Sequence, residues 1–352
     1  MLDQPTDIRS GEELDLDALQ TYLSAEWPGH ERIETLRQFP GGYSNLTYAL
    51  RTNQGEYVLR RPPFGANIKS AHDMGREYRV LSMLRPHYEQ VPQAVLRCDR
   101  EEVIGAPFYI MERVQGVILR NQPPEDIDLT PELMRAISEA TIDNLATLHN
   151  LDLESTGLID LGKPTGYIDR QVSGWIKRYR KAETDTVAGM DFLAEWLPQH
   201  QPADGPAGLI HNDYKYDNLV LHPDDLTTVK AVLDWEMCTV GDPLMDLGTT
   251  LAYWIEPGEE NPLTMGVANL TWLPGNLTRR EVVARYADAS GRDVTNVVFY
   301  YAYGAFKIGV ILQQIYKRYK LGHTKDPRFA FLIELVKVFG EQGLRAVKSG
   351  AV

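Results

Sequence analysis

Three short apolar runs surround a densely polar motif near the middle of the chain, and this pattern limits the available folds more than any other feature. The runs span residues 208–210, 219–221 and 229–233. Asp213, Asn218 and Asp234 lie between or directly after them. Apolar runs of this length with polar boundaries are typical of buried strands. We therefore expect strands that bring the three polar side chains to one edge of a hairpin.

These three side chains supply the groups that phosphoryl transfer requires. One carboxylate can take the proton of an acceptor hydroxyl, while an amide and a second carboxylate can hold a hard divalent ion. Packing rarely explains three such residues at this spacing between buried strands. The motif therefore predicts an ATP-type phosphotransferase.

Length and charge set wider limits. A chain of 352 residues with 43% apolar residues suits one large domain or two lobes. The formal net charge of −13 argues against a nucleic-acid-binding protein, whose surface would be basic. This charge is commonly a matter of solubility, and it favours cationic substrates only weakly. Cys98 and Cys238 lie far apart in sequence, so we expect neither a disulfide framework nor a cysteine-based zinc site.

Targeting and membrane signals are weak. Residues 1–5 lack the basic and apolar segments of a signal peptide. The longest apolar stretch, residues 297–312, is interrupted by Lys307 and is short for a bilayer-spanning helix. We expect a cytoplasmic protein with no membrane partner.

The first part of the chain shows mainly strand patterns. After a short helix over residues 15–25, we expect two β-hairpins between residues 33 and 60 and strands at 94–98 and 107–114. A helix over residues 70–84, capped by Ser70, carries Glu77 where it can pair with Arg60 or remain solvated. Gly41 and Gly42 form the first hairpin tip, which suits either phosphate binding or a plain surface turn.

The remainder of the chain shows helical patterns. Expected helical segments are residues 130–149, 175–180, 191–197, 242–254, 294–321 and 326–347, and a capping box at Thr278 opens another. The fold class is therefore α+β. A small lobe of residues 1–114 contains a five-stranded antiparallel sheet and one helix, and a large helical lobe of residues 115–352 carries the hairpin.

On these residues the chain resembles the aminoglycoside phosphotransferase and choline kinase-like family of the protein-kinase-like superfamily. The most specific part is His211-x-Asp213-x-x-x-x-Asn218 followed by Asp234-x-Glu236. The likeness extends from residue 39 to residue 319 and is strongest for a subgroup fused to acyl-CoA dehydrogenases in animals. It implies a bilobal protein-kinase-like fold, with a nucleotide-binding lobe followed by a catalytic and substrate-binding lobe.

The resemblance also implies catalytic and metal-binding roles. Asp213 would be the catalytic base that orients and deprotonates the substrate hydroxyl. Lys215 would contact the transferred phosphoryl group, where a cation neutralises developing charge. Asn218 and Asp234 would bind Mg²⁺.

Further residues would bind the nucleotide. The resemblance implies that the loop over the phosphates consists of Gly41, Gly42, Ser44 and Asn45. Arg60 takes the place of the phosphate-binding lysine of other kinases, with Glu77 as its ion-pair partner. An arginine can hold phosphate oxygens in bidentate fashion, but its reach differs from that of lysine. Met111 would lie behind the adenine, and the Glu112 carbonyl and Val114 N–H would hydrogen-bond its edge.

Departures from protein kinases indicate the acceptor class. Asn212 replaces the arginine that reads a phosphorylated activation loop, and Trp235-Glu236 replaces Phe-Gly. Only residues 237–241 separate the metal motif from Asp242, which leaves no room for an activation segment. A small molecule with a hydroxyl group is therefore favoured over a peptide.

Three functions remain open at this point. The first is a Mg-ATP-dependent kinase, with GTP not excluded, that acts on a hydroxyacyl-CoA or hydroxy acid in preference to an aminoglycoside. Family analogy adds an acyl-CoA dehydrogenase as a partner. The second is a nucleotide-binding regulatory module without transfer. The third is a metal-dependent hydrolase using His211, Asp213 and Asp234, which leaves Arg60 and Glu77 unexplained.

Overall fold

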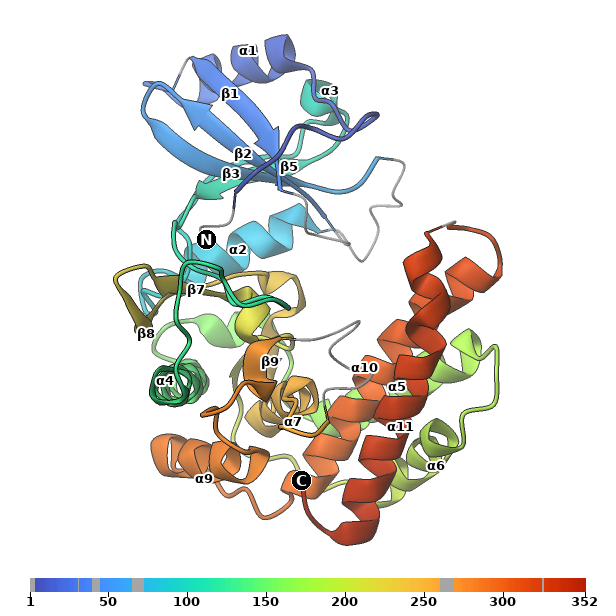
Figure 1. Ribbon diagram of the computed structural model, residues 1–352. Helices are drawn as coiled ribbons and strands as arrows, with labels where there is room; N and C mark the ends of the chain where they lie inside the picture. The colour runs from blue at the N-terminus through green and yellow to red at the C-terminus, as the bar shows by residue number, and fades with distance from the viewer. Residues whose placement is uncertain (1–3, 31, 40–44, 65–72, 260–268, 325) are drawn as a thin grey trace. The chain divides into compact units, whose positions relative to one another are not determined.

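The computed structural model describes residues 4–30, 32–39, 45–64, 73–259, 269–324 and 326–352 (Figure 1). The chain divides into two compact units. The first, here called the N-terminal unit, holds residues up to Val117 together with 220–223 and 230–236, and the second, the C-terminal unit, holds the rest. The predicted boundary at residue 114, between a nucleotide-binding lobe and a catalytic and substrate-binding lobe, stays a prediction.

The N-terminal unit contains a five-stranded sheet in the order β1-β2-β3-β5-β4 (Figure 1). Its strands are β1 (Ile33–Gln38), β2 (Leu46–Thr52), β3 (Gly55–Arg61), β4 (Ala94–Cys98) and β5 (Phe108–Glu112). Every neighbouring pair is antiparallel. The predicted five-stranded antiparallel sheet is therefore confirmed.

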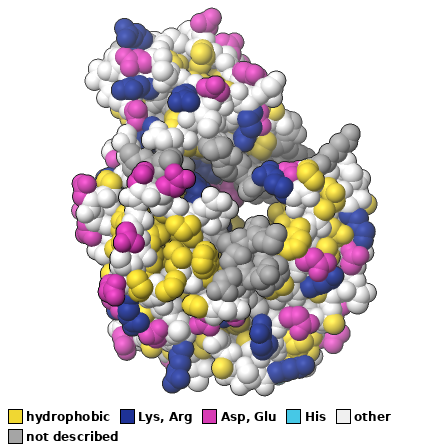
Figure 2. All heavy atoms as spheres, viewed as in Figure 1, with side chains coloured by type: hydrophobic (Ala, Val, Ile, Leu, Met, Phe, Trp, Pro, Cys, Tyr) yellow, Lys and Arg dark blue, Asp and Glu magenta, His cyan; other side chains and the backbone are white. Residues whose placement is uncertain are grey.

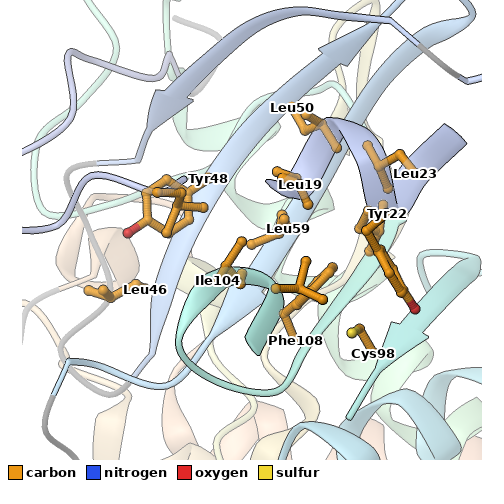
Figure 3. Close-up of a cluster of buried hydrophobic side chains, with 13 residues drawn as sticks. Leu19, Tyr22, Leu23, Leu46, Tyr48, Leu50, Leu59, Cys98, Ile104 and Phe108 are labelled. Carbon is orange, nitrogen blue, oxygen red and sulfur yellow. The ribbon is translucent and has the colours of Figure 1, made fainter. Parts of the chain in front are cut away.

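Two helices cover one face of this sheet. They are α1 (Leu16–Glu26), which begins after an Asp15 cap, and α3 (Glu101–Ile104), which was not predicted because it is only one turn long. Figure 3 shows Leu19 and Leu23 of α1 gathered with Leu59 and Phe108 of the sheet, and all four side chains are fully buried. Burial of each such side chain contributes about 1.5–3 kcal/mol relative to leaving it in water.

The opposite face of β3 carries Arg60, the residue predicted to bind phosphate. Successive side chains of a strand point to opposite faces. Since Leu59 belongs to the core shared with α1, Arg60 lies on the other face, where it meets α2 (Met74–Leu84). The cap of α2 is Asp73, whose carboxylate accepts the Arg76 N–H at 2.9 Å, so the predicted Ser70 cap is wrong. Ser70 itself lies outside the described residues.

The C-terminal unit is mainly helical, as predicted. Its helices are α4 (Pro131–His149), α5 (Tyr167–Ala182), α6 (Ala188–Trp196), α7 (Pro243–Tyr253), α9 (Arg279–Ser290), α10 (Val297–Lys320) and α11 (Leu332–Ser349). Short 3₁₀ turns in the chain are η1 (Leu158–Leu161), η2 (Leu197–Gln199), η3 (Tyr216–Asn218), η4 (Trp235–Met237), η5 (Leu270–Trp272) and η6 (Pro327–Phe331). Helix α10 packs against α5, α6, α7 and α11, and α4 packs against α9 (Figure 1). Among the described helices, none has the length and apolar character needed to cross a membrane.

The three apolar runs at the polar motif are strands, but they do not form one hairpin. Strand β6 (Gly208–Ile210) pairs with β9 (Thr239–Gly241), which the sequence pattern did not reveal. Strands β7 (Leu219–His222) and β8 (Asp225–Val232) form a separate two-stranded sheet. A three-residue strand with two non-apolar members is too short for a periodic signal, which explains why β9 was missed.

Gly116 lets the chain leave β5 along a tightly packed path. A Cβ atom at this position would lie 2.3 Å from the backbone oxygen of Leu221 and 2.5 Å from Val220 Cγ1. Directly after it, Val117 and Leu221 exchange two backbone hydrogen bonds of 2.9 and 2.8 Å. Only glycine allows so close an approach, so residue 116 is fixed by packing.

Positive and negative side chains are interspersed over the face seen in Figure 2, and the excess of acidic residues does not gather there into one patch. The acidic side chains on this face therefore do not mark a binding site for a polycation.

The capping box of α9 is expected to contribute measurably to stability. Thr278 Oγ1 accepts the Glu281 N–H at 3.2 Å, and Glu281 Oε2 accepts the Thr278 N–H at 2.8 Å. Thr278→Ala should lower the unfolding free energy by about 1 kcal/mol, because the Glu281 N–H loses its partner while the backbone N–H of residue 278 keeps Glu281 as its acceptor. Chemical denaturation measures this loss. Thr147→Ala, at an exposed site inside α4, is the control and should leave stability nearly unchanged.

Candidate active site

Asp213, Lys215 and Asn218 come together in the loop between β6 and β7 of the C-terminal unit. Lys215 Nζ lies 3.2 Å from Asp213 Oδ2. Asn218 Nδ2 donates to the backbone oxygen of Asp213 at 2.8 Å and to Asp213 Oδ2 at 3.0 Å. The carboxylate is therefore oriented by a cation and an amide from its own loop.

The charge of Asp213 is set by its surroundings. Burial alone would raise the pKa of Asp213, but nearby Lys215, His211 and Lys307 outweigh it and hold that pKa below its usual range. Burial opposes the charge of Lys215 as well, yet Asp213 raises the pKa of Lys215 above its ordinary value. The Lys215 ammonium also lies over the Tyr253 ring, 4.6 Å from its centroid. Both groups therefore remain charged at neutral pH.

A second carboxylate, Asp246 of α7, holds the backbone of this loop. Its oxygens accept the N–H groups of His211 at 2.6 Å and Asn212 at 2.8 Å. His211 is fully buried, and its Nδ1 accepts the Asp213 N–H at 3.2 Å, so its side chain holds the backbone of the loop. The side chain of Asp246 is also fully buried, so its position is fixed by packing as well as by hydrogen bonds.

Two residues of the motif have unusual backbone geometry. Asn212 has φ of 69° and Asp234 has φ of 67°, and they are the only non-glycine residues with positive φ in the described part of the chain. Asparagine and aspartate tolerate this left-handed region better than other non-glycine residues. Backbone strain of this kind clusters at functional sites, which fits their position in the motif.

In the N-terminal unit, Arg60 connects two carboxylates. Its Nη1 is bonded to Glu77 Oε1, and its Nη2 lies 3.1 Å from Asp234 Oδ1. Glu236 Oε2 lies 3.9 Å from the same Nη2. The side chains of Arg60 and Glu77 are only 9% and 2% exposed, so this is a buried ion pair. The expected pairing of Arg60 with Glu77 is present, and the contact with Asp234 is additional.

In this cluster, burial and ion pairing shift the pKa values of Arg60 and Glu77 in opposite directions. Burial would lower the pKa of Arg60, but Glu77, Tyr109 and Asp234 raise it above its usual value. Burial raises the pKa of Glu77, while Arg60 opposes the rise. Arg60 is therefore a permanent cation, and its charge is what keeps two nearby carboxylates close to it.

The predicted phosphate-binding loop is only partly visible. Gly41, Gly42 and Ser44 lie outside the described residues. Asn45 is buried, and its Nδ2 donates to Glu236 Oε2 at 2.8 Å, while Arg76 Nη1 donates to the Glu236 backbone oxygen at 3.1 Å. Glu236 is thus fixed from two directions, by the residue that precedes β2 and by a residue of α2.

The predicted adenine-binding residues lie at the end of β5. Met111 is buried, and Glu112 is half-buried with its N–H donated to the Gln93 carbonyl at 2.9 Å. Val114 follows the strand and is also half-buried. Glu56 Oε2 accepts from both Arg113 and Gln115 at 2.8 Å, which braces the segment on either side of Val114.

The predicted metal ligands have suitable donor atoms. Asn218 uses its amide nitrogen on Asp213, so its carbonyl oxygen is the end that can ligate a metal. Asp234 contacts Arg60 through Oδ1, so its other carboxylate oxygen is the one that can ligate a metal. An amide oxygen and a carboxylate oxygen fit a hard ion such as Mg²⁺. In the described part of the chain, no group of three or more His, Cys, Asp or Glu side chains is arranged to hold a metal.

Sequence reasoning missed three contributors to this site. They are Tyr253 beside Lys215, Glu236 beside Arg60, and Lys307, whose ammonium donates to the Asn212 carbonyl at 2.7 Å. Lys307 left a signal, because a lysine inside a long apolar run needs a buried partner. Glu236 was recognised in the Asp234-x-Glu236 pattern but was given no role, and an aromatic residue such as Tyr253 is too common to stand out without the fold.

Comparison with known proteins identifies relatives of the whole chain. A sequence model described as the phosphotransferase enzyme family matches residues 35–283. Acyl-CoA dehydrogenase family member 11 of Rattus norvegicus is 34% identical over 340 residues, covering 94% of this chain and 43% of that protein. The chain thus spans less than half the length of the curated relatives that it matches.

Solved structures match over nearly the full chain. The structure of an inferred aminoglycoside phosphotransferase from Ralstonia eutropha superposes with a TM-score of 0.80 and 32% identity, covering 96% of this chain and 99% of that one. The ternary complex of aminoglycoside phosphotransferase APH(4)-Ia with ADP and hygromycin B has a TM-score of 0.59 and 14% identity, covering 93% and 99%. The second likeness concerns the fold alone.

Proposed function

Because the chain belongs to the phosphotransferase enzyme family, we propose that it transfers the terminal phosphoryl group of Mg-ATP to a hydroxyl group of a small molecule in the cytoplasm. The observation that carries the proposal is the setting of Asp213. A charged, half-buried carboxylate with Lys215 at 3.2 Å and Asn218 at 3.0 Å is suited to orienting a hydroxyl beside a cation. The intact set of Asp213, Asn218 and Asp234 favours transfer over nucleotide binding alone.

The chain's own groups divide the work of transfer. Asp213 accepts a hydrogen bond from the acceptor hydroxyl and takes its proton as the new bond to phosphorus forms. Its lowered pKa makes it a weak base, so its main effect is orientation, with proton transfer late in the reaction. Lys215 stabilises the charge that develops on the transferred group.

The nucleotide is held by the N-terminal unit. Arg60 binds phosphate oxygens with N–H groups not used on Glu77 and Asp234, and the segment from Met111 to Val114 receives the adenine. Asn218 and Asp234 would hold Mg²⁺, which neutralises phosphate charge when bound. APH(4)-Ia, which has a similar fold, has been solved with ADP, which supports an adenine nucleotide.

The acceptor class follows from relatives and from charge. The curated relatives are acyl-CoA dehydrogenase family members, so we propose a hydroxyacyl-CoA or a related hydroxy acid as the acceptor and an acyl-CoA dehydrogenase as a partner. The lysines that act on the Asp213 carboxylate, Lys215 and Lys307, disfavour an aminoglycoside and suit an anionic acceptor.

A panel of acceptors with γ-labelled ATP tests this function. The panel contains hydroxyacyl-CoAs, free hydroxy acids and aminoglycosides, each with and without Mg²⁺. We expect label to move to a hydroxyacyl-CoA or hydroxy acid only when Mg²⁺ is present. Thermal-shift titration with Mg-ATP in parallel separates the alternative, because a stabilised protein that labels no acceptor would indicate a nucleotide-binding module. Label on aminoglycosides alone would contradict the acceptor class but not the reaction.

A further inference from the structure

Lys307 is a fully buried cation in the middle of α10. Its exposed fraction is 1%, and residues 299–310 of this helix are all buried. A charged ammonium is almost never removed from water unless specific partners compensate it. The charge of Lys307 helps to keep the pKa of Asp213 low, but this long-range effect does not require a hydrogen bond to any particular group.

The partner of Lys307 is the residue that precedes the catalytic base. Lys307 Nζ donates to the backbone oxygen of Asn212 at 2.7 Å and lies 3.4 Å from Asn212 Oδ1. The Asn212 N–H is held by Asp246 at 2.8 Å. The side-chain amide nitrogen of Asn212 donates to the backbone oxygen of Met237 at 3.1 Å and to Tyr167 Oη at 3.3 Å. Asn212, whose backbone is in the left-handed region, is therefore fixed at its N–H, its carbonyl and its side chain.

The helices that carry Lys307 and Asp246 touch backbone to backbone. A Cβ atom on Gly304 of α10 would lie 2.2 Å from the Gly248 oxygen, and one on Gly248 of α7 would lie 2.1 Å from the Tyr300 oxygen. Asp246 lies two residues before Gly248, and Lys307 lies three residues after Gly304. This close approach sets an anion and a cation on either side of the same peptide segment.

The surroundings leave Lys307 charged at neutral pH but able to titrate. Burial lowers the pKa of Lys307 to about 8, while Asp246 and Asp213 oppose the change and Lys215 adds to it. Three other titratable groups lie near Asp246 or Asn212, namely His149 of α4, His211 and Tyr167 of α5. His149 Nε2 lies 3.2 Å from Asp246 Oδ2. In turn, Lys307 is one of the cations that keep Asp213 ionised.

We propose that Lys307 is a positioning residue of the phosphoryl-transfer centre, whose buried ammonium fixes the left-handed turn at Asn212 and thereby the direction of the Asp213 carboxylate. The proposal rests on the proposed function of Asp213 as the base. Lys307 acts through the peptide that it holds and does not contact substrate. A packing role alone would require neither the charge nor a hydrogen bond to this one carbonyl.

Kinetics of three variants separate positioning from packing. Lys307→Met removes the donor with little change in shape, Lys307→Arg keeps a charge that does not titrate, and Lys320→Met removes an exposed lysine of the same helix that pairs with Asp185 at 2.8 Å. Turnover of Mg-ATP is measured across neutral and alkaline pH, with water as the acceptor if no better one is known.

The expected results differ between the variants. Lys307→Met should lower kcat by about tenfold or more with KM for Mg-ATP nearly unchanged, because a misdirected base slows the chemical step. Wild-type kcat should decline as pH rises through about 8, and this decline should be absent in Lys307→Arg. Lys320→Met should follow the wild type throughout. Wild-type kinetics in Lys307→Met would overturn the proposal.

Amide hydrogen exchange tests the positioning without catalysis. The N–H groups of His211, Asn212 and Asp213 are all hydrogen-bonded in this loop. They should exchange faster in Lys307→Met than in the wild type and at the wild-type rate in Lys320→Met. If the wild type transfers phosphate to nothing, the proposed function fails while this comparison still decides the positioning. If Lys307→Met does not fold, wild type and Lys307→Arg are compared above pH 8, and identical exchange of the three amides there would overturn the proposal.

Discussion

Asp213→Asn is expected to reduce phosphoryl transfer by about 10²- to 10⁴-fold while the protein still binds Mg-ATP. The substitution keeps the shape of the side chain but removes the negative charge that accepts the hydroxyl proton. It also leaves Lys215 without the carboxylate that lies 3.2 Å away. Turnover with the best acceptor of the panel measures the first effect, and calorimetric titration with Mg-ATP measures the second.

The matched control for this variant is Asp225→Asn. Asp225 is exposed at the first position of β8, where it accepts hydrogen bonds from Thr227 and Thr228. Both variants lose one carboxylate from the same region of the chain, so a difference between them reports on position and not on net charge. Full activity in Asp213→Asn would remove this residue from the role of base.

The second large effect is expected at the buried ion pair of β3 and α2. Glu77→Gln should lower the unfolding free energy by about 3–5 kcal/mol, because Arg60 then remains buried with one of its two close carboxylates missing. The contact of Arg60 with Asp234 at 3.1 Å places the expected loss toward the lower end of this range. Chemical denaturation measures it. Glu34→Gln, which removes exposed ion pairs with Arg32 at 3.1 Å and with Arg51 at 3.6 Å, should cost about 1 kcal/mol or less.

A double variant separates stability from nucleotide binding at this pair. Arg60→Met with Glu77→Met replaces both charges by apolar side chains and should be more stable than either single variant. It should nevertheless lose affinity for Mg-ATP, because the cation that binds phosphate is gone. Wild-type affinity in a folded double variant would show that Arg60 has no part in nucleotide binding.

Much of the fold could be predicted because its signals are local. Alternating apolar residues predicted the strands of the N-terminal unit, and Thr130, Asp242 and Thr278 marked helix starts that the structure has at α4, α7 and α9. The missed features lack such signals. Helix α3 is one turn long, and the β6–β9 pairing joins segments about thirty residues apart.

In the candidate site, too, only the residues with a local sequence signal could be predicted. The spacing of Asp213, Asn218 and Asp234 is a local pattern, so these residues could be named from sequence. The contacts of Lys307 with Asn212 and of Arg60 with Asp234 join residues 95 and 174 positions apart, and neither periodicity nor a motif records such a pairing. Tertiary packing alone decides which cation lies beside which carbonyl or carboxylate.

The most direct test of the central claim is ³¹P NMR of the protein with Mg-ATP and a hydroxyacyl-CoA. Phosphoryl transfer to a hydroxyl produces a phosphomonoester resonance together with those of ADP, and the account predicts that both grow with the wild type and not with Asp213→Asn. ADP with inorganic phosphate as the sole product would leave the acceptor unidentified. An unchanged ATP spectrum with the whole acceptor panel, from a protein that calorimetry shows to bind Mg-ATP, would contradict phosphoryl transfer.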